Sequence, residues 1–167
     1  GYSVYDTDSE AKRLMESSLE VVQKLSECFG RDIYHNGRLN RGLLSSRVFG
    51  ESDKIVLLNS IVHPVVRFDF YRWSESLNEE ICFVESAILY ESRFDELVDE
   101  VWTVTAPEEL RIGRVRQRSG LTEEEIKKRM AAQLSEEEKQ RRAAHIIWND
   151  GNVSVIHRVL SLLKSLE

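Results

Sequence analysis

Short apolar runs without clean alternation mark three predicted strands. The runs are Ile81 to Val84, Val101 to Val104 and His145 to Trp148, and each is β-prone. A strand covered on both faces has this near-continuous pattern, which is typical of a buried parallel sheet. A fourth run ends at Val4-Tyr5 and gives way to Asp6-Thr7-Asp8, so we expect these aspartates at the C-terminal tip of a strand, where ligands gather in α/β proteins.

Apolar residues at helical spacing predict helices between these runs. One begins near Ser9, and a second covers Leu19 to Phe29 and ends at Gly30, as a glycine after a helix predicts. A polar turn follows at Tyr34 to Gly37. Asn40 is a candidate N-cap for the next helix.

The middle of the chain is predicted to be a helical insertion. One helix runs from about Asp53 to Val62, and His63-Pro64 is expected to reset the backbone before a long helix to about Leu77. The reason is that proline fits a first helical turn and not a helix interior. Further helix starts are predicted at Pro107, at the capping boxes Thr122 with Glu125 and Ser135 with Glu138, and in a closing helix from Val153 to Leu166.

Helices that alternate with buried strands indicate one α/β domain over residues 1–167, with a doubly wound, mostly parallel sheet and helices on both faces. Apolar residues make up 41 % and charged residues 31 % of the chain, a composition typical of an ordinary soluble globular protein that does not indicate disorder. No apolar run approaches the roughly 20 residues that cross a bilayer, and a signal peptide is not seen, so we expect a cytoplasmic protein. The two cysteines and four histidines lack metal-ligand spacing, so no structural metal is predicted.

Basic residues are concentrated between positions 111 and 142, although the formal net charge of the chain is −6. Such a segment is typical of a mobile cover over a polyanionic nucleotide. Acidic residues lie between the basic ones, so a solvated helical surface with i,i+4 ion pairs is the alternative, and charge alone favours it. The basic residues are Arg111, Arg114, Arg116, Arg118, Lys127, Lys128, Arg129, Lys139, Arg141 and Arg142.

Four segments, in their order along the chain, resemble the dephospho-coenzyme A kinases. They are VYDTDSEAKRL (Val4 to Leu14), His63-Pro64, the pair Arg114 and Arg118, and GLTEEEIKKRMAAQLSEEEK (Gly120 to Lys139). The resemblance implies a P-loop kinase fold with a helical acceptor-substrate region at about residues 30–80 and a lid at about 114–143. It also implies transfer of the ATP γ-phosphoryl group, with Mg²⁺, to the 3′-hydroxyl of dephospho-coenzyme A, the last step of coenzyme A synthesis.

The two aspartates are the candidates for the chemistry at the acceptor hydroxyl. Phosphoryl transfer needs a carboxylate that orients the hydroxyl or accepts its proton. Asp8 matches the catalytic aspartate of the family, and Asp6 would hold the hydroxyl or reach the metal shell if the chain stays extended. The alternative is that Asp8 caps the helix that begins near Ser9.

Three basic residues of the lid are candidates for phosphate binding. Arg114 and Arg118 are one helical turn apart, so both guanidinium groups can grip neighbouring phosphates from one side. Arg114 matches the arginine that faces the active site in the family, and Lys139 matches a basic position that could reach the triphosphate. The alternative for each is a surface ion pair worth less than about 1 kcal/mol.

The resemblance implies further contacts with the substrates. His63-Pro64 matches the edge of the acceptor pocket, and Glu91 matches a glutamate of the same region. The segment Asn149 to Asn152 resembles the loop along the adenine ring, with Asn149 and Gly151 as the expected binding residues. Structural roles are the alternatives, namely a histidine before a helix-starting proline and an ordinary Asn/Gly turn. Ala87 and Ala144 depart from the family, which usually has proline and aspartate there.

The sequence has no glycine-rich loop of the form G-x-x-x-x-G-K-[ST], which in this family cradles the triphosphate. We therefore expect the strand, loop and helix of that segment to be missing and the chain as it stands to be inactive. Another nucleoside or nucleotide kinase, and a non-catalytic nucleotide- or coenzyme-binding module, remain alternatives. Nucleic-acid binding is opposed by the overall acidity and by the lack of aromatic residues among the lid arginines.

Overall fold

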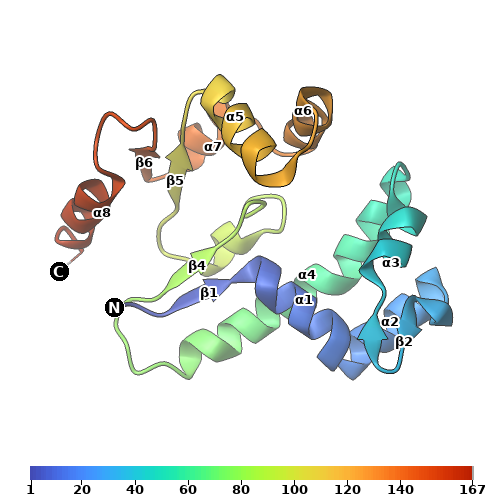
Figure 1. Ribbon diagram of the computed structural model, residues 1–167. Helices are drawn as coiled ribbons and strands as arrows, with labels where there is room; N and C mark the ends of the chain where they lie inside the picture. Colours follow the sequence, from blue (N-terminus) through green and yellow to red (C-terminus); the bar gives the residue numbers. More distant parts are fainter. Residues whose placement is uncertain (167) are drawn as a thin grey trace. The chain divides into compact units, whose positions relative to one another are not determined.

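The computed structural model describes residues 1–166 and shows two compact units, Gly1–Ser92 and Arg93–Glu167. Each unit contains helices and one pair of parallel strands (Figure 1). Within residues 1–166, no helix is both long and apolar enough to cross a membrane. The sequence-based assignment of one kinase-like domain stays a prediction.

The first unit is built on strand β1 (Val4–Asp6), which pairs in parallel with β4 (Phe83–Glu85). Tyr5 lies opposite Val84, and the residue is 3 % exposed. The predicted strand around Ile81 to Val84 is confirmed, although it begins later, because the first bond of the ladder runs from the Phe83 amide to the Ser3 carbonyl.

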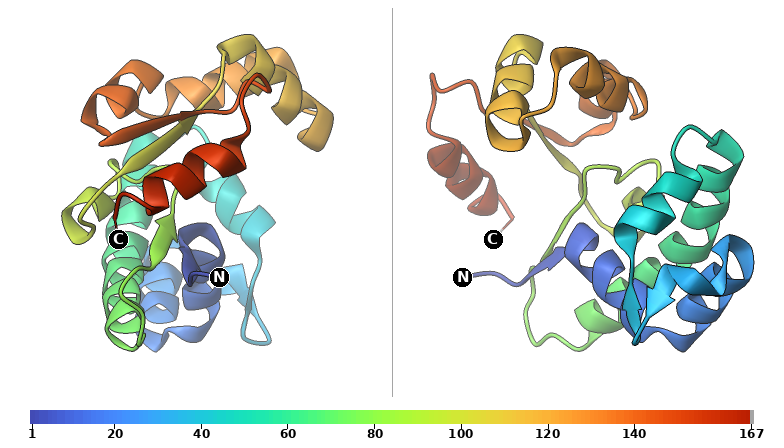
Figure 2. Two further views of the ribbon diagram at one scale, coloured as in Figure 1. Left: turned by 90° about the vertical axis from the view of Figure 1, so that its left-hand side faces the viewer. Right: turned by 45° about the vertical axis from the view of Figure 1, so that its right-hand side comes forward.

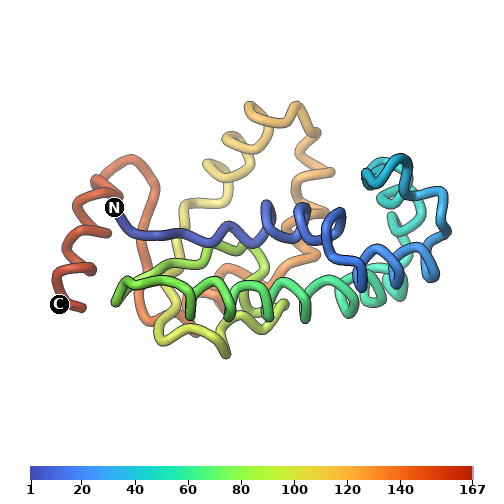
Figure 3. Tube along the Cα trace, turned by 90° about the horizontal axis from the view of Figure 1, so that it is seen from below, coloured from blue at the N-terminus to red at the C-terminus, as the bar shows by residue number. Residues whose placement is uncertain are grey.

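Helices α1 (Thr7–Ser17), α2 (Leu19–Phe29) and α4 (Ser52–Glu75) pack together in this unit, and α4 runs along α1 (Figure 3). Helix α2 has the predicted bounds and ends at Gly30, whose φ of 93° is a backbone conformation that suits glycine. The buried side chains that join these helices include Leu14, Val21, Leu25, Val66 and Phe70.

Helix α4 passes through Pro64 without a break, so the predicted division at His63-Pro64 is wrong. Residues on both sides of the proline bury one continuous face, with Val62 and Val66 at 6 % and 3 % exposure. A proline inside a helix costs roughly 3 kcal/mol, and burial of this face offsets that cost. The Pro64 ring itself lies on the exposed side of the helix.

A small β-hairpin precedes helix α3 (Arg41–Val48). Its strands are β2 (Tyr34–His35) and β3 (Arg38–Leu39), after the 3₁₀ helix η1 (Arg31–Ile33). Asn36 and Gly37 have φ values of 49° and 75°, as a type I′ hairpin turn requires. The predicted polar turn is therefore a hairpin, and the Asn40 side chain caps α3 as predicted.

The second unit contains the parallel pair β5 (Trp102–Thr105) and β6 (His145–Trp148), after the 3₁₀ helix η2 (Phe94–Leu97). Both predicted strands are confirmed within one residue. Helices α5 (Glu108–Ser119), α6 (Glu123–Ala131) and α7 (Glu136–Arg142) lie between them in sequence, and α8 (Val155–Leu163) follows and packs against β6 (Figure 2).

Helix starts in the second unit follow the sequence signals. Thr122 and Glu125 form the predicted capping box of α6. The Ser135 side chain accepts from the Glu138 amide at the start of α7. Pro107 is the residue before α5. The last helix is shorter than the predicted Val153 to Leu166: it begins after Ser154, which caps it, and it ends at Leu163.

Candidate functional site

Asp6, the last residue of β1, is the N-cap of α1. Its Oδ1 accepts hydrogen bonds from the amides of Asp8 and Ser9 at 3.0 and 3.1 Å, and its Oδ2 accepts from Ser9 Oγ at 2.7 Å. These bonds from the Ser9 side chain and backbone lower the pKa of Asp6, so the carboxylate stays ionised. The chain turns into the helix at Thr7, which rules out the extended Asp6 to Asp8 arrangement.

Asp6, and not Asp8, is therefore the cap of α1, so the alternative that Asp8 caps this helix is wrong. Asp8 lies in the first turn of α1, and its side chain is 77 % exposed. Lys12, one turn later, forms an ion pair with Asp8 Oδ2. An accessible carboxylate beside a cation at a helix N-terminus fits a group that meets an incoming hydroxyl.

Asp8 also lines a cavity of about 380 Å³ within the first unit. Its other walls come from the apolar side chains of α1, β3, α3 and the start of α4, with Lys12, Arg41 and Ser45 as the remaining polar groups. Small-molecule sites have volumes of about 300 to 1,000 Å³ and this mixture of mostly apolar and a few polar groups. The cavity lies within the predicted acceptor region of residues 30–80, extended by the first turns of α1.

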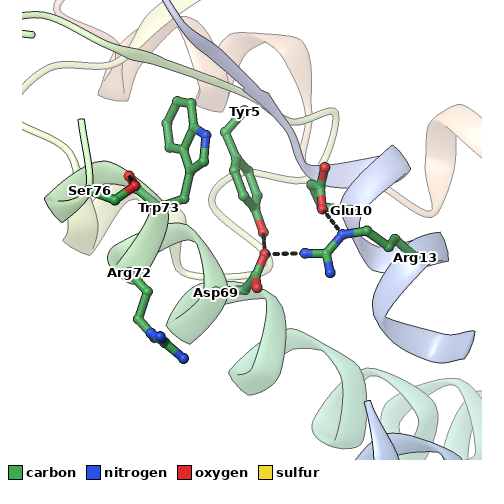
Figure 4. Close-up of a pocket in the computed structure, with 7 residues that line it drawn as sticks. All are labelled: Tyr5, Glu10, Arg13, Asp69, Arg72, Trp73 and Ser76. Atoms are coloured by element: carbon green, nitrogen blue, oxygen red, sulfur yellow. Dashed lines mark hydrogen bonds and ion pairs between the residues drawn. The ribbon is translucent and has the colours of Figure 1, made fainter. Parts of the chain in front are cut away.

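A second cavity in the same unit, of about 460 Å³, is larger but contains none of the predicted site residues (Figure 4). Tyr5 Oη donates to Asp69 Oδ2 at 2.7 Å, and Arg13 Nη2 donates to the same oxygen at 2.7 Å. Arg13 is also paired with Glu10. These groups satisfy one another and join β1, α1 and α4, so we assign them a structural role.

His63 and Pro64 lie in the middle of α4, and the side chains that line the Asp8 cavity do not include them. Burial lowers the pKa of His63, and the charge of Arg67 lowers it further, so the ring is neutral at neutral pH. Arg67 lies one turn after His63, and its Nη1 is 3.4 Å from the Ser92 carbonyl oxygen. It thereby ties this helical face to the loop that carries the exposed Glu91.

In the second unit, Arg114 and Asn149 are brought together across 35 residues of sequence. Arg114 Nη1 donates to the Asn149 carbonyl oxygen at 2.8 Å, and Nη2 is 3.5 Å from Asn149 Oδ1. The Asn149 amide donates to the Thr105 carbonyl at 2.7 Å, which fixes the loop to the end of β5. Arg114 of the predicted lid and the predicted adenine loop are therefore in direct contact.

The remainder of that loop is a local turn. Asp150 Oδ1 accepts a hydrogen bond from the Asn152 amide at 2.9 Å, and this bond lowers the pKa of Asp150. Gly151, between them, has a φ of 89°, which disfavours any side chain. The turn exposes Gly151 beside the Arg114 contact.

Ion pairs separate the basic residues of the predicted lid into two groups. Arg141 and Arg142 both bond Glu138 and lower the pKa of Glu138 to about 2, while Lys127 pairs with Glu123 at 2.6 Å. The solvated-surface interpretation is right for these three. Arg114 instead contacts neutral oxygens, and Arg118, within the described residues 1–166, forms no ion pair. The two arginines remain suited to an anion.

Lys139 lies beside Glu136 on α7, with its Nζ at 3.9 Å from Glu136 Oε1 and 3.2 Å from Gln133 Oε1. Glu136 Oε1 also pairs with Arg111 at 3.2 Å, and its Oε2 accepts from Thr105 Oγ1 at 2.8 Å. Thr105 is 3 % exposed, so this carboxylate joins α7 to the end of β5. Glu136 holds Lys139 and Arg111 close to the loop at Asn149.

Three residues that the sequence interpretation did not single out interact with the predicted site residues: Lys12 and Glu136 form ion pairs with them, and the charge of Arg67 acts on His63. Lys12 and Arg67 follow Asp8 and His63 by four positions, so the i,i+4 rule was a usable signal. Glu136 had no usable signal, because its partners Thr105 and Arg111 are more than 20 positions away.

Residues 1–154 of the chain match the family model described as Dephospho-CoA kinase. The Dephospho-CoA kinase of Porphyromonas gingivalis is 35 % identical over 167 residues, which cover 99 % of this chain and 83 % of the relative. The crystal structure of TT1252 from Thermus thermophilus has a TM-score of 0.83 at 33 % identity, covering 99 % of this chain and 84 % of that one.

A solved Dephospho-CoA kinase from Campylobacter jejuni shares the fold, with a TM-score of 0.71 at 23 % identity over 100 % of this chain and 88 % of that chain. The two structural likenesses agree with the parallel strand pairs and the helices around them. The predicted α/β fold of the P-loop kinase type is thereby confirmed.

Proposed function

This chain belongs to the dephospho-CoA kinase family, and we propose on that basis that it transfers the γ-phosphoryl group of ATP to the 3′-hydroxyl of dephospho-CoA. The observation that carries the acceptor half of the proposal is the position of Asp8. Its carboxylate is accessible, is not used as a helix cap and lines a cavity of suitable size. Asp8 would orient the 3′-hydroxyl and take its proton as the new O–P bond forms.

The second unit supplies the groups for the phosphates and the adenine. Arg114, fixed by Asn149, would present its fork of N–H groups to the transferring phosphoryl group, where a planar guanidinium is matched to two oxygens. Arg118 and Lys139 would bind the neighbouring phosphates, with Lys139 oriented by Glu136. Asn149 and Gly151 would lie along the adenine ring. His63, Pro64 and Glu91 would contact dephospho-CoA.

ATP and Mg²⁺ are the cofactors that the family implies. Mg²⁺ binds one or two carboxylates together with substrate phosphates. Asp6 does not fit this role, because its two oxygens already accept three hydrogen bonds within α1. Among residues 1–166, no cluster of three or more His, Cys, Asp or Glu side chains could hold the ion alone. We propose that Mg²⁺ is held chiefly by the ATP phosphates.

Our proposal includes the finer hypothesis that residues 1–167 alone are inactive. No G-x-x-x-x-G-K-[ST] segment occurs in the sequence, so no backbone loop of that type is present to cradle the β- and γ-phosphates. The same observation favours the second candidate function, a nucleotide- or coenzyme-binding module without catalysis. A purified polypeptide of residues 1–167 that makes CoA from ATP and dephospho-CoA would contradict the hypothesis of inactivity.

The acceptor assay separates the candidate functions. A form of the protein that carries a phosphate-binding loop is supplied with ATP, Mg²⁺ and either dephospho-CoA or adenosine, and ADP formation is followed. We expect turnover with dephospho-CoA and little with adenosine. Turnover with adenosine instead would identify a nucleoside kinase, and binding of both substrates without ADP formation would identify the non-catalytic module.

Asp8→Asn tests the proposed base. Turnover should fall by about two orders of magnitude or more, as removal of a general base predicts. Stability should change by less than about 1 kcal/mol, because only an exposed i,i+4 pair with Lys12 is lost. Asp53→Asn is the matched control, since Asp53 is also an exposed aspartate in a first helical turn. Near-normal turnover in Asp8→Asn would remove Asp8 from the mechanism.

A further inference from the structure

Helix α5 carries three arginines on one face, although the sequence interpretation assigned phosphate binding to only two of them. Arg111, Arg114 and Arg118 are spaced by three and four residues, which places them on one stripe of the helix. The helix rises by about 10 Å between Arg111 and Arg118. This stripe is long enough to contact more than one phosphate of a nucleotide, and Arg111 is its member nearest in sequence to β5.

Arg111 is held at the end of β5 by two contacts. Its Nε donates to the Ala106 carbonyl oxygen at 3.0 Å, and its Nη1 lies 3.2 Å from Glu136 Oε1. The side chain is 28 % exposed, so part of it remains accessible. A guanidinium has five N–H donors in a planar fork, and a group that is already held in one orientation loses little side-chain entropy when it binds an anion.

The cluster around Arg111 has more positive than negative groups. Glu136 Oε1 also lies 3.9 Å from Lys139 Nζ, so two cations share one carboxylate oxygen. The side chains of Glu136 and Lys139 are only 22 % and 15 % exposed, and electrostatic attraction is stronger where water is partly excluded. Two positive groups and one negative group in such a place favour the binding of an anion.

Thr105 connects this cluster to the predicted adenine loop. Its hydroxyl donates to Glu136 Oε2 at 2.8 Å, and its carbonyl oxygen accepts from the Asn149 amide at 2.7 Å. The residue is 3 % exposed, so both contacts are shielded from water. One buried residue therefore sets the position of the loop and, through Glu136, that of Arg111.

We propose that Arg111 is a further phosphate-binding residue and that it binds a phosphate that remains in ADP. This inference rests on the function proposed above, in which Arg114 faces the transferring phosphoryl group. Arg111 is tied through Glu136 and Thr105 to the loop proposed to lie along the adenine, so it serves the adenosine side of the triphosphate. Glu136 and Thr105 are positioning residues, because they act through Arg111.

Arg111→Gln tests the assignment, with Arg116→Gln as its matched control. Both variants remove one positive charge from α5, but Arg116 is exposed and lies off the stripe. The experiment uses the form of the protein that carries a phosphate-binding loop, as in the acceptor assay. The measurements are the KM values for ATP and for dephospho-CoA, and the Kd for ADP by isothermal titration. Thermal unfolding checks that the variants are folded.

We expect Arg111→Gln to raise the KM for ATP and the Kd for ADP about tenfold or more, because a charge-assisted hydrogen bond to a phosphate is lost. Its KM for dephospho-CoA, and all three values of Arg116→Gln, should stay within about twofold of the unmodified protein. Equal ADP affinities in the two variants would overturn the inference and leave the proposed function standing. A loss for ATP without a loss for ADP, or an equal rise of both KM values, would overturn it too. If the unmodified protein forms no ADP with dephospho-CoA, the proposed function itself fails.

Thr105→Val is a second test, and it removes no charge. Valine keeps the shape of the side chain and loses the bond to Glu136. We expect the Kd for ADP to rise about threefold or more, whereas Thr105→Ser, which keeps the hydroxyl, should bind ADP like the unmodified protein. Should Arg111→Gln not fold, an unchanged Kd in Thr105→Val overturns the inference by itself.

Discussion

Tyr5→Phe removes one hydroxyl from the contact that anchors β1, the strand that leads into Asp6 and Asp8. The Tyr5 ring packs edge-on against Phe70 and tilted against Trp73, at centroid distances of 5.3 and 5.2 Å. Phenylalanine preserves these contacts. The change therefore tests the hydrogen bonding of Tyr5 Oη, which donates chiefly to Asp69 Oδ2 at 2.7 Å and lies 3.4 Å from the Val66 carbonyl oxygen.

The expected loss of stability at neutral pH is about 1.5 kcal/mol. A hydrogen bond to a charged group contributes roughly 1.5 to 3 kcal/mol. The lower end applies, since Asp69 is 29 % exposed and keeps its bond to Arg13. For a chain of this length, the loss corresponds to a fall in Tm of roughly 3 to 6 °C.

The pH dependence gives a sharper test. Burial raises the pKa of Tyr5 well above its usual value, and the Asp69 hydrogen bond and charge raise it further. A raised pKa in the folded state means that the stabilisation is complete below the unfolded pKa of about 10 and is lost as pH rises above it. The loss amounts to about 1.4 kcal/mol per pH unit, so the two proteins should have nearly equal stability near pH 11.

The assay is urea unfolding of both proteins between pH 7 and 11. Tyr34, whose pKa burial raises to about 12, is present in both and contributes equally to the two curves. Tyr71→Phe is the control, because Tyr71 is 54 % exposed on α4 and should change stability by no more than about 0.5 kcal/mol. A stability difference for Tyr5→Phe that stays constant up to pH 11 would refute the reasoning.

Three further predictions address the predicted lid and two glycines. Arg114→Lys should lower turnover about tenfold or more, because lysine keeps the charge but cannot hold Asn149 and a phosphate with one planar fork. Arg116→Lys, at an exposed position of the same helix, should not lower turnover. Equal activity of the two variants would show that Arg114 belongs to the solvated surface. Gly30→Ala should destabilise by about 1 to 3 kcal/mol in thermal unfolding, because φ is 93° and the new Cβ would lie 2.6 Å from Arg47 Nη1. Gly113→Ala, inside α5 and in open space, should stabilise by about 0.5 to 1 kcal/mol, and a loss there would contradict the argument.

Much of the candidate site was predicted from the sequence. Asp8, Arg114, Arg118 and Lys139 were found through resemblance, and their helices were found through caps and periodicity. The roles of these four residues stay predictions. What the structure adds is which of them have competing partners, such as the pairing of Lys139 with Glu136.

The sequence by itself determined the local structure of this protein. Thr122 with Glu125, Ser135, Asn40 and Gly30 all act where they were predicted, because a cap joins groups within about three residues of each other. The strands from Trp102 and from His145 were equally local, since a short apolar run bounded by polar residues specifies a buried strand without reference to its partner.

Only the tertiary structure decided the rest. Pro64 stays inside α4 because burial of one continuous face outweighs a local penalty, and Asp6 rather than Asp8 became the cap because β1 pairs as far as Glu85 before the chain turns. Arg114 contacts Asn149 across 35 residues of sequence, and Tyr5 contacts Asp69 across 64 residues. Such contacts depend on which surfaces the packed helices and strands bring together, and the local propensity of a residue does not determine its long-range partners.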